Sequence, residues 1–318
     1  TDLVCGILCL AISFIRNDSW MIGALIFANI VQAIAFAFSR PANKAIITEL
    51  VEKDELVLYN SRLELVMQVV SVSSPVLSFL VLQFASLRIT LVLDALSFFL
   101  AFGLVALLPK KEEKAFGEKK LTFRVIFSDI KEGVHYIVKQ KEIFFLLVMA
   151  SSINFFFAAF NYLLPFSNQL YGVQGAYATI LTMGAIGSIV GALLASKIKA
   201  SMEMLLFLLA LTGFGVMIMG FTLPSYLTFS GNFVCELFMT IFNIHFFTQV
   251  QTKVEGEYLG RVLSSIYTLA ILFMPIAKGF MTVLPSVYLS SFLIIGSGVI
   301  ILSCISFIYV RTHFEKEI

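Results

Sequence analysis

Charged residues are scarce in this sequence. Asp, Glu, Lys and Arg together make up 13% of its 318 residues, whereas a soluble domain carries about 25%. Hydrophobic residues reach 59%, with 33 Phe and a single Trp. A soluble chain of this length would bury one or two cores and cover them with polar residues. The composition therefore excludes an ordinary soluble protein, and a net charge of +2 gives no reason to expect a nucleic acid partner.

Cysteines and catalytic motifs are equally few. Cys5 and Cys9 share one helix face, Cys235 and Cys304 are isolated, and none has the spacing of a metal site. Thiols in such places are small apolar fillers, so we expect neither a disulfide nor a bound metal. The sequence also lacks a Walker-type phosphate loop, a His-Glu-x-x-His motif and a Gly-x-Ser-x-Gly motif. We therefore expect no enzyme activity and no cofactor.

Long apolar runs are abundant. A helix needs about 20 apolar residues to cross the hydrocarbon core of a bilayer, and nine of the ten runs approach or exceed this length. The runs are residues 3–15, 20–38, 63–84, 87–108, 143–166, 176–195, 204–223, 226–250, 262–284 and 287–310. The sequence therefore predicts an all-α protein, a polytopic membrane helical bundle with ten transmembrane helices in this chain.

The basic residues lie on one side of these runs. When successive connections are placed on alternate sides, 19 of the 22 Lys and Arg residues fall on the same side. Arg16 and Arg88 fall on the other side, and Lys278 lies inside a run. The side rich in Lys and Arg is cytoplasmic in membrane proteins. This pattern predicts a multi-pass plasma-membrane protein with both ends of the chain in the cytoplasm.

A basic loop, residues 109–142, divides the chain into parts 1–108 and 143–318, with four runs before the loop and six after it. Apolar residues at three- and four-residue spacing predict an amphipathic helix in its second part. Two six-helix halves would need two further helices before residue 1. The first run, with only 13 residues, agrees with this, although it could also be a re-entrant or interfacial segment. We expect a chain lacking the first two of 12 helices.

A short internal repeat supports two related halves. Val51-Glu-Lys-Asp-Glu-Leu56 follows the second run, and Val254-Glu-Gly-Glu-Tyr-Leu259 follows the eighth. Both strings read Val-Glu-x-acid-x-Leu, lie on the basic side, and precede a run with an internal proline, Pro75 or Pro275. Six runs separate the two strings, as duplication of a six-helix unit requires.

Four stretches carry further motifs. They are Ser39-Arg-Pro-Ala-Asn-Lys-Ala-Ile-Ile-Thr-Glu-Leu-Val51, Leu93-Asp-Ala-Leu-Ser-Phe-Phe99, Ile130-Lys-Glu-Gly-Val134, and Val250-Gln251 followed by Tyr258-Leu-Gly-Arg261. In this order they resemble motifs of major facilitator superfamily exporters: the stretch after the fourth helix, the sixth helix, the central loop, and the stretch before the eleventh helix. The resemblance is strongest to the branch with macrolide efflux pumps and the enterobactin exporter.

This resemblance implies a fold and an activity. It makes the first run equivalent to the family's third helix and implies the 12-helix major facilitator fold. It also implies a monomeric secondary active transporter that needs no cofactor and draws energy from a proton gradient. The sequence departs from the family in places: the antiporter signature is reduced to Ser74-Pro75 without its glycines, and Glu52 and Glu255 stand where the family has proline.

Polar side chains inside the apolar runs are candidates for a transport site, because an uncompensated charge at mid-bilayer costs about 2.5–3.5 kcal/mol. Four of them in the eighth run, at spacings of four, four and three, share one helix face. The substrate-cavity candidates are Asn29, Gln32, Asn154, Asn161, Asn232, Glu236, Thr240 and Asn243. By the resemblance, their helices line the central cavity. Hydrogen bonding between helices is the alternative role.

Three charged residues are candidates for proton coupling: Glu236, Lys278 and Asp94. Lys278 could pair with Glu236 as a coupled titrating unit, extend to the membrane interface, or bind an anionic part of a substrate. Asp94 could instead support helix packing. Separately, Gly187-x-x-x-Gly191 predicts a close contact between two helices.

The function favoured by these observations is export of an amphipathic compound, such as a macrolide-like drug, by proton antiport and alternating access in a bacterial membrane. An apolar interior rich in Phe and Met suits such a substrate better than a sugar. The substrate and membrane lipid are the expected partners. A siderophore or peptide exporter is the alternative within transport. A non-transporting membrane scaffold or a degenerate remnant is the alternative outside it.

Overall fold

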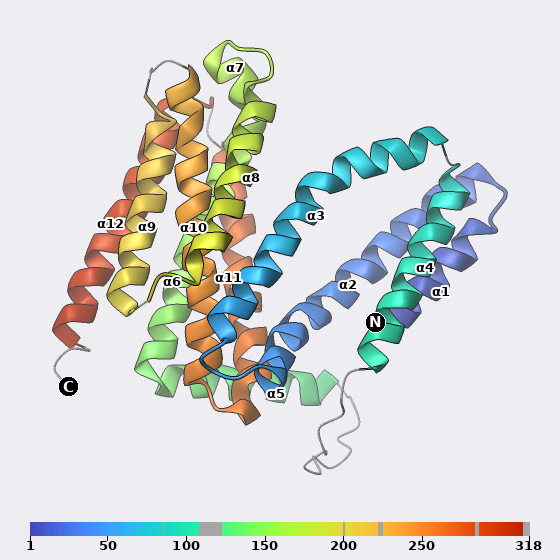
Figure 1. Cartoon of the computed structure of the whole chain (residues 1–318), viewed down its shortest axis with the longest axis horizontal. Coiled ribbons are helices and arrows are strands. Elements are labelled where there is room, and N and C mark those ends of the chain that lie inside the picture. Colours follow the sequence, from blue (N-terminus) through green and yellow to red (C-terminus); the bar gives the residue numbers. More distant parts are fainter. Residues whose placement is uncertain (85, 108–122, 200, 222–224, 284–285, 314–318) are drawn as a thin grey trace. The chain divides into compact units, whose positions relative to one another are not determined.

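The computed structural model describes residues 1–84, 86–107, 123–199, 201–221, 225–283 and 286–313 (Figure 1). Within these residues all regular structure is helical. The elements are α1 (Asp2–Ser13), α2 (Asp18–Leu50), α3 (Leu56–Phe84), α4 (Leu87–Ala106), α5 (Phe123–Lys139), α6 (Lys141–Leu163), the short η1 (Leu164–Phe166), α7 (Ser167–Tyr171), α8 (Ala176–Ala195), α9 (Met202–Ile218), α10 (Ser225–Lys253), α11 (Gly256–Val283) and α12 (Ser290–His313).

Each apolar run of the sequence forms a helix of its own, and α5 is the predicted amphipathic helix of the central loop. Seven spans among the described residues are long and apolar enough to cross a membrane. Two further apolar helices are shorter: α1 has 12 residues and α9 has 17. At about 1.5 Å per residue, α1 covers roughly 18 Å of a hydrocarbon core about 30 Å thick. The chain is a multi-pass membrane protein.

Apolar side chains cover much of the helix exterior. On α12, Ile294, Ile301, Ile305 and Ile308 are each 57–70% exposed, and their spacing of seven, four and three places them on one helix face. In a monomer, an apolar surface of this kind would promote aggregation if it faced water. It is the surface expected of a helix that faces hydrocarbon.

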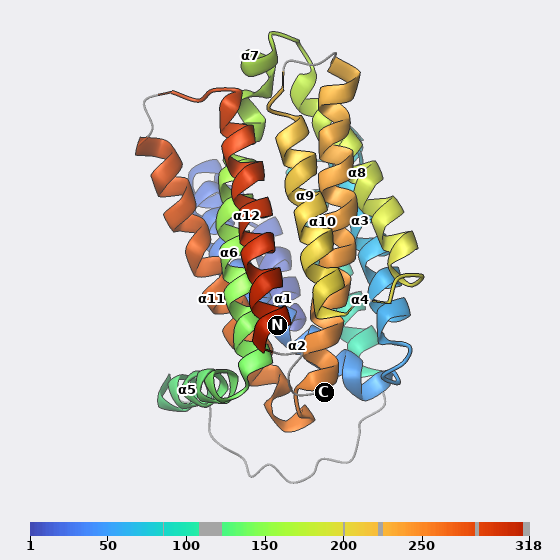
Figure 2. The same ribbon diagram turned by 90° about the vertical axis from the view of Figure 1, so that its left-hand side faces the viewer.

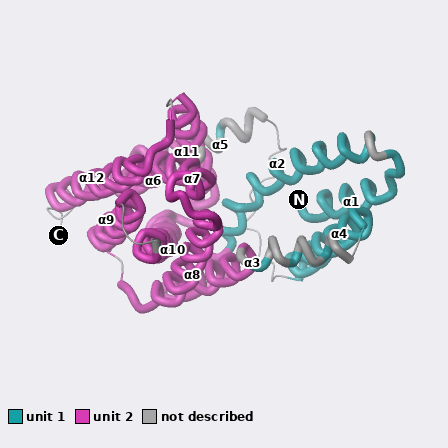
Figure 3. The backbone as a smooth tube through the Cα atoms, turned by 90° about the horizontal axis from the view of Figure 1, so that it is seen from above, with its two compact units in different colours: residues 1–46, 72–131 teal, residues 47–71, 132–318 magenta. Residues whose placement is uncertain are grey.

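The helices form two compact units, coloured separately in Figure 3. The first contains residues 1–46 and 72–131, and the second contains residues 47–71 and 132–318. Helices α2, α3 and α5 therefore contribute to both units. The predicted division into 1–108, 109–142 and 143–318 follows the repeat and differs from these units, chiefly because residues 47–71 pack with the second one. The six-helix halves stay a prediction.

The first unit is built on contacts among α1, α2 and α4. Ile12, Met21, Ala28 and Leu91 form its buried apolar cluster. The core is small because most side chains on these helices point outward: only 11% of the α2 span and 11% of the α4 span are buried.

In the second unit, glycines allow α8 and α10 to pack closely against each other. A Cβ atom added at Gly187 would collide with the carbonyl oxygen of Phe233 in α10, and one at Gly191 would lie 2.5 Å from the carbonyl oxygen of Leu237. Small residues allow two helix backbones to approach this closely. The predicted glycine contact is thus present, and Figure 2 shows α8 and α10 running side by side.

Helix α9 also makes close backbone contacts at glycines, and it does so on two sides. A Cβ at Gly215 would lie 2.7 Å from the carbonyl oxygen of Gly231 in α10, and one at Gly213 would lie 2.8 Å from that of Gly296 in α12. Glycine therefore meets glycine at both contacts. These pairings fix α8, α10, α9 and α12 as neighbours in that order, which sets the face that α10 presents to each.

Candidate functional site

The polar stripe of α10 lies along the contact with α8. Asn232 is 2% exposed, and its Nδ2 donates a hydrogen bond to the carbonyl oxygen of Ile180 at 2.8 Å. Its Oδ1 is buried and, among the described residues, has no hydrogen-bond partner. Gly184 makes room for this side chain, because a Cβ there would collide with the Asn232 amide. Asn232 therefore contributes a hydrogen bond to the helix contact, and its part in a substrate cavity stays a prediction.

Glu236 is the acidic group of this stripe. It is half-buried, and the Ser188 hydroxyl of α8 donates a long hydrogen bond of 3.4 Å to its Oε2. Ser188 itself is 3% exposed. The pair thus places a carboxyl group and a hydroxyl donor between two helices that are each apolar enough to span a membrane.

The remaining residues of the stripe differ from each other in burial. Thr240 is 4% exposed and packs against Gly191, where a Cβ would lie 3.1 Å from its own. Asn243 is half-buried. The stripe is one helix face, as its spacing predicted, but Asn232 and Thr240 are covered by α8, whereas Glu236 and Asn243 keep part of their surface free.

The candidates on the other helices bond locally. Asn154 of α6 donates to the Ala150 carbonyl at 2.8 Å, and Asn29 of α2 donates to the Leu25 carbonyl at 2.9 Å, each one turn back in its own helix. Asn161 is exposed. Asn29 is exposed as well and Asn154 is half-buried, and the role of all three in a substrate cavity stays a prediction.

Gln32 of α2 makes a contact between helices instead. Its Nε2 donates to Cys9 Sγ of α1 at 3.4 Å. This bond within the first unit is the interhelical alternative predicted for such amides.

Lys278 and Asp94 are both exposed. Among the described residues no ion pair joins Lys278 to Glu236, so the structure does not bring the predicted pair together. Asp94 directly precedes Ala95, which is completely buried. The roles of both residues in proton coupling stay predictions.

Ser188 was not among the candidates drawn from the sequence. A serine between Gly184 and Gly191 on one face of α8 was the available signal, because only a polar group on the small-residue face can meet the stripe of α10. Periodicity within α10 could not identify this partner.

A second constellation joins the central-loop helix α5 to the start of α11. The Arg261 guanidinium lies 3.0 Å from Glu132 Oε2. A Cβ at Gly133 would lie 2.9 Å from the Arg261 carbonyl oxygen. The rings of Tyr136 and Tyr258 stack with centroids 4.6 Å apart. The Glu-Gly motif of the loop and the Leu-Gly-Arg motif in the first turns of α11 are therefore two sides of one contact, which we name the α5 dock.

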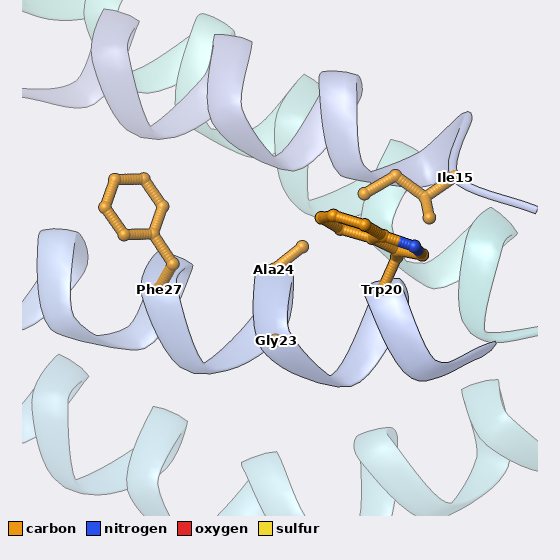
Figure 4. A pocket seen from close by; sticks show the side chains of 5 residues that line it. All are labelled: Ile15, Trp20, Gly23, Ala24 and Phe27. Atoms are coloured by element: carbon orange, nitrogen blue, oxygen red, sulfur yellow. The ribbon is translucent and has the colours of Figure 1, made fainter. Parts of the chain in front are cut away.

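An apolar hollow of about 420 Å³ lies in the first unit (Figure 4). It is lined by Ile15, Trp20, Gly23, Ala24 and Phe27. These residues offer almost no polar group to orient a ligand, and specific small-molecule sites usually contain a few. The hollow therefore lacks the polar groups that the stripe of α10 offers.

Comparison with known proteins agrees with this architecture. Residues 3–272 match the Major Facilitator Superfamily. The chain belongs to this family. It is thus a membrane transporter by family, and the resemblance read from its motifs is confirmed.

Named relatives of this major facilitator chain are efflux proteins. It is 24% identical over 285 residues to macrolide efflux protein A of Enterococcus faecalis, covering 85% of this chain and 84% of the relative. It is 25% identical over 285 residues to macrolide efflux protein A of Streptococcus pyogenes, covering 85% of this chain and 67% of the relative. At these identities, sequence similarity by itself does not assign the relatives' substrate to this chain.

Proposed function

We propose that this chain exports an amphipathic compound of the macrolide class from a bacterial cytoplasm by proton antiport. Membership of the Major Facilitator Superfamily supports alternating access, and the two relatives named for macrolide efflux support the substrate class. Neither one gives the energy source.

The observation that carries the proton-coupled part is Glu236. A carboxyl group inside a membrane span is costly unless it has a role, and such groups commonly serve as proton relays. Glu236 keeps part of its surface free and has one hydroxyl donor, Ser188, at 3.4 Å. In the proposed scheme Glu236 takes up and releases the transported proton while Ser188 holds it to α8.

The orientation follows from the basic residues. The ends of α2 and α10 and the start of α11 lie at the side rich in Lys and Arg, and we place this side in the cytoplasm. In that orientation the α5 dock is cytoplasmic, and the α1–α2 and α3–α4 connections, with Arg16 and Arg88, face outward. No cofactor is needed in this scheme, and the transporter works as a monomer in the plasma membrane.

The test is the accumulation of a labelled macrolide in cells that produce the full-length protein. We expect lower accumulation than in cells without the protein, and we expect a protonophore to abolish the difference. If accumulation is the same with and without the protein, the macrolide assignment fails. A labelled siderophore or peptide in the same assay then examines the other export substrates. If export persists unchanged with the protonophore, proton coupling fails and export stands.

A further inference from the structure

Three polar side chains meet where the beginning of α3 touches the end of α10. Asn60 Nδ2 donates hydrogen bonds to Gln251 Oε1 at 2.8 Å and to Thr248 Oγ1 at 3.1 Å. Asn60, Thr248 and Gln251 are 1%, 7% and 3% exposed. The partners are about 190 residues apart in sequence, yet they lie in the same compact unit.

Apolar residues seal this cluster. Leu56, one turn before Asn60, is completely buried, as is Val250 beside Gln251, and Val254 is 5% exposed. A buried amide that loses its partner without gaining water is costly. These three polar groups are therefore stable in two situations only: bonded to each other, or separated and hydrated.

The cluster joins equivalent ends of the internal repeat. The string Val51 to Leu56 leads directly into Asn60, and Gln251 directly precedes the string that begins at Val254. By the predicted division, α3 belongs to the first half of the transporter and α10 to the second. The contact therefore connects the two halves, at the end of the molecule that carries Lys53, Arg62 and Lys253.

We propose that Asn60, Thr248 and Gln251 form a latch that closes the cytoplasmic face of this transporter. The proposal rests on alternating access as given under the proposed function. When the halves part at this face, α3 must leave α10, the three side chains become hydrated, and the latch is open. Because the latch contains no ion pair, its strength is insensitive to salt, unlike a charged gate.

The end of α10 is fixed on its other side. Lys253, two residues after Gln251, forms an ion pair with Glu142 at the start of α6. The α5 dock holds the α11 side of the same connection through Arg261 and Glu132. These two ion pairs thus hold the segment with Thr248 and Gln251 in the second half, and Asn60 is the member of the latch that moves away.

The test uses a thiol introduced by Ser61→Cys. Ser61 is 4% exposed and its hydroxyl donates to the Val57 carbonyl in its own helix, so a thiol there is shielded while the latch is closed. In inside-out membrane vesicles, its reaction with a membrane-impermeant maleimide is followed by mass spectrometry of the labelled peptide. Substrate is absent, so this measurement does not depend on the macrolide assignment or on proton coupling.

We expect Asn60→Leu and Gln251→Leu each to accelerate labelling about tenfold, since each removes a buried hydrogen bond between the halves. The double variant should be no faster than Asn60→Leu alone, because that change already removes the bond to Gln251 together with the bond to Thr248. Thr248→Val, which removes the second acceptor and keeps the side-chain shape, should accelerate labelling to a smaller extent. Thr252→Val is the matched control, because the Thr252 hydroxyl bonds the Thr248 and Gln249 carbonyls of its own helix.

Unchanged labelling in all three latch variants, with protein that elutes as a folded species, overturns the proposal. Independent, multiplying effects of Asn60→Leu and Gln251→Leu would overturn it as well. Should Asn60→Leu fail to fold, Thr248→Val and Gln251→Leu still decide the matter. Faster labelling together with absent macrolide export would leave the latch standing and remove the proposed substrate.

Discussion

Glu236 owes its importance to where α8 and α10 place it. On an isolated helix it would be one of several polar groups, but the glycine-lined face of α8 covers Asn232 and Thr240 and leaves Glu236 partly free beside Ser188. A titratable group thus lies at the contact of two apolar helices, which is why we propose it for proton transfer.

Replacing Glu236 with Gln tests this role. Glu236→Gln keeps the shape and can still accept from Ser188, but it cannot carry a proton, so we expect export that responds to the proton gradient to disappear while the protein still folds. The measurement is protonophore-sensitive macrolide efflux, with protein amount determined in the same membranes. Glu257→Gln, at an exposed position in the first turn of α11, is the matched control and should export normally. Normal coupled export by Glu236→Gln would assign the proton to another group.

At the scale of helices, the glycines decide which faces meet. The α8–α10 contact uses Gly184, Gly187 and Gly191, three positions where a Cβ would strike α10. Two helices in such close backbone contact can shift against each other only if the residues at the contact have small side chains.

The change Gly187→Ala should destabilise the second unit. Its methyl group would strike the Phe233 carbonyl in a helix backbone that cannot yield easily, and overpacking of this kind costs about 1–3 kcal/mol. Thermal unfolding in detergent should therefore begin at a lower temperature. Gly279→Ala in α11, where a Cβ would meet nothing within 4 Å, serves as control. An equal melting temperature for Gly187→Ala and the parent would contradict the close contact.

The α5 dock gives a second prediction at this scale. Gly133→Ala would press a methyl group against the Arg261 carbonyl and should release the second part of α5. We expect faster hydrogen–deuterium exchange in residues 132–139. Gly256→Ala, an open position at the start of α11, should leave that exchange unchanged. Equal protection in both variants would show that α5 is held by other contacts.

Much at the element scale could be predicted from the sequence. Spacings of four, four and three put Asn232, Glu236, Thr240 and Asn243 on one face of α10, and apolar spacing predicted α5 as amphipathic. These are properties of a single helix. Which neighbour covers the stripe depends on packing between distant segments, so only the glycines of α8 gave a hint of it. Nothing local marks Asn60 as the partner of Gln251, because an amide near a helix start is also common on a surface.

For the whole molecule, the two sides of the membrane were predicted from the alternation of ten apolar runs and the Lys and Arg residues between them. Within the described residues, ten helices correspond to the ten apolar runs, and the assignment of sides stays a prediction. Which side is cytoplasmic depends on the distribution of Lys and Arg. In the part of the chain that the structure describes, no ion pair joins Lys278 to Glu236, and sequence reasoning has no information on the orientation of α11 that would choose among the three roles open to Lys278.

Thiol labelling of loops examines this topology. A thiol from Asn17→Cys, in the exposed connection between α1 and α2, should react with an impermeant maleimide on intact cells. One from Lys53→Cys, in the exposed connection between α2 and α3, should react only after the cells are opened, because a helix that spans the membrane separates the two. Labelling of both in intact cells would contradict the arrangement.

The most direct measurement for the account is macrolide transport by the purified full-length protein in liposomes under an imposed pH gradient. With an acidic lumen, protons leave and the labelled macrolide should accumulate inside, above the level of protein-free liposomes, until a protonophore collapses the gradient. Glu236→Gln liposomes should show no such accumulation. If the parent protein moves the macrolide equally with and without the gradient, or not at all, proton-driven export is contradicted.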